Sequence, residues 1–106
     1  MPAYRAAPLP PRIRLDPGDG VATVYVSGDL DLFAAETLDH VLADVVAGQH
    51  VIVECADVEF MDSSGLRILM IHWRRLHATG GRLQIHDPST AVRDVIELFG
   101  VDDLLL

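Results

Sequence analysis

A strand–helix–strand succession between residues 50 and 86 leaves few folds open to this chain. Residues 50–55 (HVIVEC) form a short apolar run with β-branched side chains, which predicts a strand buried on both faces. Residues 64–79 carry apolar side chains at helical spacing before two glycines end the pattern, and residues 82–86 (RLQIH) alternate as a strand does. Because a βαβ connection closes right-handed with parallel strands, the segment predicts an α/β fold.

The flanking segments complete a predicted element order of ββαβαβα. Two strands are predicted at residues 12–15 and 21–27, separated by the turn sequence DPGDG. An amphipathic helix is predicted over residues 33–47, and a third helix is predicted from Ser89 up to Gly100. The third helix is expected to bury an apolar stripe made of Val92, Val95, Ile96 and Phe99. The predicted fold is therefore a single-domain α/β sandwich, a mixed β-sheet with helices packed on it.

The domain is predicted to span residues 12–106, and the Pro/Ala-rich residues 1–11 are expected to form a flexible tail. A length of 106 residues suits one domain, and a hydrophobic content of 50% allows a core without metal or disulfide support. The single cysteine, Cys55, excludes an internal disulfide and a cysteine-based zinc cluster, and its apolar surroundings predict a buried side chain. Residues 101–106 (VDDLLL) are expected to add a last short strand or helix.

Charge argues against several classes of partner. The net charge is −8, with eight arginines and no lysine, so the chain lacks the positive field that nucleic acids and anionic membrane surfaces require. The apolar runs are much shorter than the twenty or so residues that span a bilayer, and the first residues contain no apolar signal region. We therefore expect a cytoplasmic protein with no nucleic-acid or membrane partner.

The sequence contains none of the common enzyme or cofactor signatures. Its glycines are scattered and form no phosphate-binding loop. The histidines never fall at the i, i+4 spacing of a zinc helix, and each is expected at the surface or at a helix end: His40, His50, His72, His77 and His86. Ser63 and Ser64 lack the GxSxG context of a hydrolase nucleophile. We expect no catalytic activity, no cofactor and no metal site, and a serine-nucleophile enzyme is a remote alternative.

The most informative segment is DSSG, residues 62–65, at the junction between a strand-like segment and a helix. Helix capping by Asp62 or Ser63 explains one of these residues. Capping does not explain the second serine, nor Gly65 in the first turn, where glycine costs about 0.5–1 kcal/mol relative to alanine. The glycine either accommodates packing within the domain or lets another surface approach closely. A helix N-terminus also favours an added anion, so a phosphate on a serine there would leave the fold intact.

Two motifs resemble the signatures of a known family. VEFMDSSGLRIL, residues 58–69, is similar to the signature of STAS domains, the anti-sigma factor antagonists, and SGDLD, residues 27–31, is similar to the second signature of that family. The resemblance extends from Ile13 to the C-terminus and includes the ββαβαβα order. It implies a protein that binds an anti-sigma factor and thereby frees a sigma factor for transcription.

The resemblance also implies a phosphorylation switch. By that match, Ser63 is phosphorylated by the partner, an anti-sigma factor with serine kinase activity, and Ser64 is a secondary candidate. Phosphorylation switches binding off, and a PP2C-type phosphatase resets the switch. The partner is expected to contact the loop at residues 28–32 and the start of the second helix. The implied partner-binding residues are Asp29, Asp31, Asp62, Ser63, Ser64, Gly65 and Arg67.

Several of these assignments have alternatives. Asp29 and Asp31 are also explained as turn and N-cap residues of the helix that follows. Asp29 stands where the family more often has glutamate, and Arg67 stands where small residues are familiar, so the partner-facing surface is expected to differ in shape. Arg67 follows Ser63 by one helical turn, so it either pairs with phosphorylated Ser63 or belongs to a solvated face. An alternative function is a STAS module that is never phosphorylated and serves another regulatory or lipid-transport complex.

Overall fold

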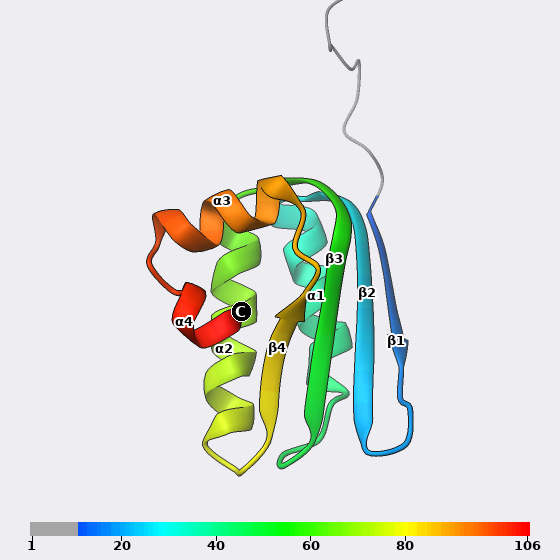
Figure 1. The fold of residues 1–106 in the computed structure, drawn as a ribbon. Helices are drawn as coiled ribbons and strands as arrows, with labels where there is room; N and C mark the ends of the chain where they lie inside the picture. Colours follow the sequence, from blue (N-terminus) through cyan, green and yellow to red (C-terminus); the bar gives the residue numbers. More distant parts are fainter. Residues whose placement is uncertain (1–10) are drawn as a thin grey trace, which may run out of the picture.

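The computed structural model describes residues 11–106 (Figure 1). The tail predicted for residues 1–11 lies outside the described residues, except for Pro11. Four strands form one sheet in the order β1-β2-β3-β4. They are β1 (Arg12–Asp16), β2 (Val21–Leu30), β3 (His50–Met61) and β4 (Arg82–His86). Strand β1 pairs antiparallel with β2, whereas β2, β3 and β4 are parallel, so the predicted mixed sheet is confirmed.

Helices α1 (Leu32–Ala43) and α2 (Ser63–His77) cover one face of the sheet, as Figure 1 shows. Helix α3 (Thr90–Leu98) follows β4 and lies across the end of the sheet, and Ser89 caps it as predicted. The last residues form a short helix, α4 (Asp102–Leu105). The predicted order is confirmed, with α4 added. Among residues 11–106, no helix has both the length and the apolar character that crossing a lipid bilayer requires.

The hydrophobic core lies between the sheet and the two helices. Alternate residues of the strands are buried on the face that the helices cover: Ala22, Val24, Val26, Val51, Val53, Cys55, Leu83 and Ile85. The helices contribute Leu38, Leu42, Leu66, Leu69 and Leu76. The strand residues that alternate with the buried ones point to the other face of the sheet and are half-buried or exposed, as Ile52 and Glu54 are in β3. The expectation that residues 50–55 are buried on both faces is therefore wrong, because the other face of the sheet has no helix on it (Figure 1).

Strands β2 and β3 are both longer than predicted. The predicted loop at residues 28–32 is wrong over its first three residues, which continue β2 beside β3. Two irregularities in the β2–β3 register, between Tyr25 and Ser27 and between Gly28 and Asp29, allow polar and glycine residues to remain in the strand. Gly28 has a φ of 85°, which explains why this stretch has the composition of a turn.

The first helix ends at Ala43, four residues before the predicted end. The amides of Asp44 and Val45 donate to the carbonyls three residues earlier, so the last turn tightens and leaves the α-helical pattern. Val45 is nevertheless buried, which is why its apolar spacing extended the prediction. In the third helix, Phe99 is 54% exposed and does not belong to the buried stripe.

Candidate interaction surface at the helix starts

The carboxyl ends of β2 and β3 meet at one edge of the sheet, and α1 and α2 begin there. Leu30 is paired with Met61 in the parallel register, and the amide of Asp62 donates to the carbonyl of Leu30 at 3.4 Å. Each strand leads directly into a helix through one aspartate, Asp31 after β2 and Asp62 after β3. The two predicted motifs, which are about thirty residues apart in the sequence, are therefore neighbours.

Both aspartates are helix N-caps. The carboxylate of Asp31 accepts a hydrogen bond from the amide of Ala34 at 3.0 Å, and that of Asp62 accepts one from the amide of Ser64 at 2.9 Å. Such caps contribute about 1 kcal/mol each. The capping alternative for Asp31 is therefore confirmed, and Asp62 rather than Ser63 caps the second helix.

Asp29 is buried, in contrast to the exposed position that a direct partner contact implies. It is the second-last residue of β2 and is only 5% exposed. The alternative prediction, that Asp29 is a turn residue, is also wrong, because Asp29 is paired with Phe60 in the sheet. Asp29 is therefore an internal group of this edge.

Ser63 is the first residue of α2 and is exposed, whereas Ser64 is half-buried. The Ser63 side chain therefore lies at the surface, at the N-terminus of a helix whose Ser64 amide is capped by Asp62. Within residues 11–106, neither serine hydroxyl is hydrogen-bonded to a histidine, so the base that a serine nucleophile needs is not in place.

Gly65 is buried at the contact between α2 and β2. A Cβ atom at this position would lie 2.8 Å from both Cγ and Cδ2 of Leu30 and 3.4 Å from Cγ of Met61. The first two distances are shorter than van der Waals contact. Of the two explanations that the sequence leaves open for this glycine, the geometry supports packing within the domain.

A groove runs between the starts of α1 and α2, next to the serines. It has a volume of about 440 Å³ and is lined by Leu32, Phe33, Ala35, Glu36, Asp39, Ser64, Arg67 and Ile68. Phe33 is 81% exposed and Leu32 is 65% exposed, which is unusual for large apolar side chains. Most of these residues were not predicted. The sequence did contain one indication of the groove: Phe33 is a large apolar residue that lies off the apolar stripe of its predicted helix, so it was not needed for the core.

A buried histidine links the two helices behind the groove. His72, in α2, is buried, and its Nε2 lies 2.6 Å from the Oδ1 of Asp39 in α1. Arg75 donates from Nε to the Nδ1 of His72 at 3.2 Å and from a terminal nitrogen to the carbonyl of Leu42 at 2.9 Å. Because a guanidinium can only donate, Nδ1 accepts and Nε2–H donates to Asp39. The expectation that His72 lies at the surface or at a helix end is wrong.

These features define a class of protein. The fold is a one-sided α/β sandwich that presents two capped helix starts, an exposed serine and an open apolar groove. The chain belongs to the STAS domain family, because the family model described as "Mlab, STAS domain" matches residues 13–106. The resemblance predicted from the two motifs is therefore confirmed.

Several proteins similar to this chain are described as anti-sigma factor antagonists. The chain is 32% identical over 86 residues to the anti-sigma-F factor antagonist RsfB of Mycobacterium tuberculosis, covering 79% of this chain and 70% of that protein. A solved anti-sigma factor antagonist from Mycobacterium paratuberculosis is 31% identical, with a TM-score of 0.77 over 95% of this chain and 87% of that chain. The phosphorylated form of the Bacillus cell fate determinant SpoIIAA shares the fold, with 24% identity and a TM-score of 0.72 over 90% of this chain and 89% of that chain.

Proposed function

We propose that this protein is an anti-sigma factor antagonist whose binding is switched off by phosphorylation of Ser63. The observation that carries the proposal is the exposure of Ser63 at the start of α2, beside an open apolar groove. Membership of the STAS family and the two mycobacterial antagonists above support it. The proposed partner is an anti-sigma factor with serine kinase activity, and a PP2C-type phosphatase would restore the binding form in the cytoplasm.

The partner would bind across the two helix starts. Leu32 and Phe33 offer exposed apolar anchors, and Glu36 and Asp39 add negative charge on the same side of the groove. A partner segment with an apolar side chain flanked by arginine or lysine would match both features. Ser63, Ser64 and Arg67 would complete this surface from α2, whereas the buried Asp29 and Gly65 would shape it from within.

Phosphorylation would act by charge and bulk. A phosphoserine carries about −1.5 to −2 charges at pH 7. At Ser63 that charge would lie next to Asp62 and near Asp31, and burying these like charges together under a partner would cost several kcal/mol, more than attraction to a basic segment would return. The amides of the helix N-terminus would tolerate the phosphate within the domain, so the fold would remain. The partner would lose its fit to this surface without any refolding of the antagonist.

The test is a binding titration against a candidate anti-sigma kinase. We expect Ser63→Ala to bind as the unmodified protein does and to resist phosphorylation, whereas Ser63→Asp binds at least about tenfold more weakly, a difference of 1.4 kcal/mol. Ser64→Ala is the matched control and should remain a substrate. Equal affinities of the alanine and aspartate variants would count against the switch.

Arg67 has a proposed role in the phosphorylated state. It lies one helical turn after Ser63 and lines the groove, and within residues 11–106 it makes no ion pair with Glu36 or Asp39. We infer that its guanidinium pairs with phosphorylated Ser63. Arg67→Ala should then raise the phosphoserine pKa and change the rate of dephosphorylation. If both quantities stay at their wild-type values, Arg67 belongs to the solvated face.

The same titration tests the alternative functions. A STAS module that serves another regulatory or lipid-transport complex would bind its partner equally well as Ser63→Ala and Ser63→Asp, and it would not be phosphorylated. A serine-nucleophile enzyme would form a covalent adduct at Ser63 with an activated ester. Because no histidine within residues 11–106 is hydrogen-bonded to this serine, we expect no such adduct in intact-mass measurements.

A further inference from the structure

The face of the sheet that the helices leave open carries a second group of polar side chains. Glu54 in β3 and His86 in β4 are direct neighbours in the parallel register. The Nδ1 of His86 lies 3.0 Å from the Oε1 of Glu54. Asp87 follows at the end of β4 with a φ of 47° and is the one described non-glycine residue with a positive φ. One nitrogen and two carboxylate oxygens from these residues all lie within 4.8 Å of one another.

This geometry fits a divalent transition-metal ion. Ligand atoms about 2.1 Å from an ion are about 3.0 Å apart at a right angle and about 3.4 Å apart at a tetrahedral angle. The Glu54–His86 separation already meets this requirement. The third ligand needs only a small side-chain rotation, because Asp87 is exposed and its carboxylate is already within 4.8 Å. Imidazole with two carboxylates suits Zn²⁺ or Mn²⁺, whereas Mg²⁺ and Ca²⁺ prefer oxygen ligands alone.

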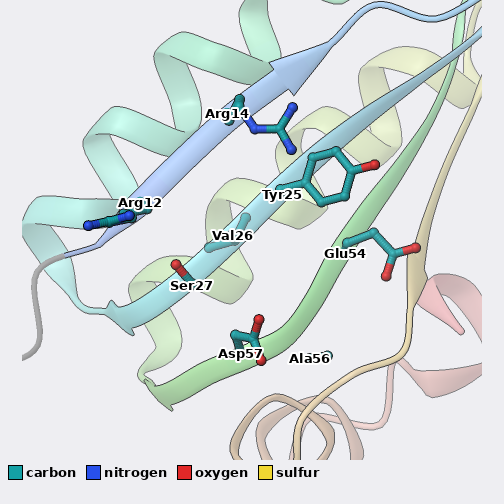
Figure 2. A pocket seen from close by; sticks show the side chains of 8 residues that line it. All are labelled: Arg12, Arg14, Tyr25, Val26, Ser27, Glu54, Ala56 and Asp57. Carbon is teal, nitrogen blue, oxygen red and sulfur yellow. The ribbon is translucent and has the colours of Figure 1, made fainter.

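The surroundings leave room for further ligands. Glu54 also borders a hollow of about 310 Å³ on the same face, whose lining is shown in Figure 2. Asp57 lies on one side of this hollow, and Arg12 and Arg14 lie on the other, where Arg14 stacks over the ring of Tyr25 at 4.3 Å. Because His86 and Asp87 are exposed, water could complete the coordination of an ion held by three protein ligands.

In contrast to the expectation from the sequence that there is no metal site, we propose that Glu54, His86 and Asp87 bind one divalent first-row transition-metal ion on the open face of the sheet. The sheet register fixes the first two ligands, and the left-handed backbone of Asp87 turns the chain so that its carboxylate stays beside them. The site lies on the opposite side of the sheet from the α1–α2 groove and is independent of the proposed antagonist function.

The experiment is isothermal titration of the full chain, stripped with a chelator, against ZnCl₂. We expect saturable binding of one equivalent. His86→Ala should weaken it at least tenfold because it removes one of three ligands, and Asp87→Asn should do the same because a neutral amide oxygen replaces a charged carboxylate. Asparagine tolerates the left-handed backbone of Asp87, and His86 is exposed, so both variants should fold, as far-UV circular dichroism would verify.

Two further measurements separate this site from other histidines. His50→Ala removes an exposed histidine at the start of β3, the strand that carries Glu54. This variant should leave the Zn²⁺ affinity unchanged. With Mn²⁺ as the probe, paramagnetic broadening of amide resonances should centre on Glu54, His86 and Asp87. The proposal is wrong if no saturable binding occurs up to about 1 mM Zn²⁺, or if His86→Ala and Asp87→Asn bind as tightly as the wild type. In either case Glu54 and His86 form a hydrogen-bonded pair only.

Discussion

At the scale of single residues, burial gives neighbouring side chains of β3 opposite chemistry. Glu54 faces the open side of the sheet, whereas Cys55 is 2% exposed and belongs to the core. Burial, and to a smaller extent the charge of Glu54, raises the pKa of Cys55 from 9.0 to about 12. The thiolate is the reactive form of cysteine, so this thiol should be inert in the folded protein.

The raised pKa of Cys55 makes stability depend on alkaline pH. Between pH 9 and 12 the unfolded chain releases the thiol proton and the folded chain keeps it, so the free energy of unfolding falls as pH rises. We expect wild type to lose about 1.4 kcal/mol more than Cys55→Ala between pH 8 and pH 10. Urea unfolding at both pH values measures this difference. The same loss in both proteins would contradict the assignment.

At the scale of elements, the contact between α2 and β2 depends on one missing side chain. Gly65 lets the first turn of α2 lie against Leu30, which is 3% exposed and has little freedom to move. An added methyl group would cost about 1–3 kcal/mol through overpacking and would recover somewhat less than 1 kcal/mol in helix propensity. The packing cost should be the larger effect.

Gly65→Ala should therefore lower the free energy of unfolding by about 1 kcal/mol, measured by urea denaturation. In a Leu30→Ala background, where the clash is gone, the same substitution should be neutral or stabilising. A double-mutant cycle over the four proteins isolates the coupling between the two positions. Additive effects would show that Gly65 is not required by this contact.

The element order was predictable because each strand and helix has its own periodicity, as RLQIH does in β4. The ends of the strands and helices could not be predicted in the same way, because they depend on contacts with segments that are distant in the sequence. Residues 28–30 have the composition of a loop, and only pairing with β3 makes them a strand. The DSSG segment was recognisable because its residues are consecutive. The groove and the Asp39–His72 bond were not, because they require α1 and α2 to be placed side by side.

At the scale of the whole molecule, the chain carries a large excess of negative charge. The chain has a net charge of −8 over 106 residues and no lysine. Among residues 11–106, Arg93 and Glu97 lie 4.0 Å apart, and the Asp39–His72 and Glu54–His86 contacts pair a carboxylate with a histidine. Self-repulsion of this kind destabilises a folded state and is screened over about 10 Å at 0.1 M salt.

Salt should therefore stabilise the domain near neutral pH. We expect the Tm at pH 7.5 to rise by about 2–5 °C between about 10 mM and about 150 mM NaCl, as followed by circular dichroism. Near the sequence pI of about 4.8, where the net charge is small, the same step should change the Tm by about 1 °C or less. A fall in Tm with salt at pH 7.5 would mean that attractive pairs dominate.

The sheet is a single layer with helices α1 and α2 on one side. The helix starts and the open face of the sheet are therefore two separate surfaces, and binding at one does not block the other. A partner bound at the helix starts leaves the open face of the sheet accessible. A ligand bound on that open face leaves Ser63 exposed. Such a domain can be held in place through the open face of its sheet while the helix starts exchange one binding partner for another.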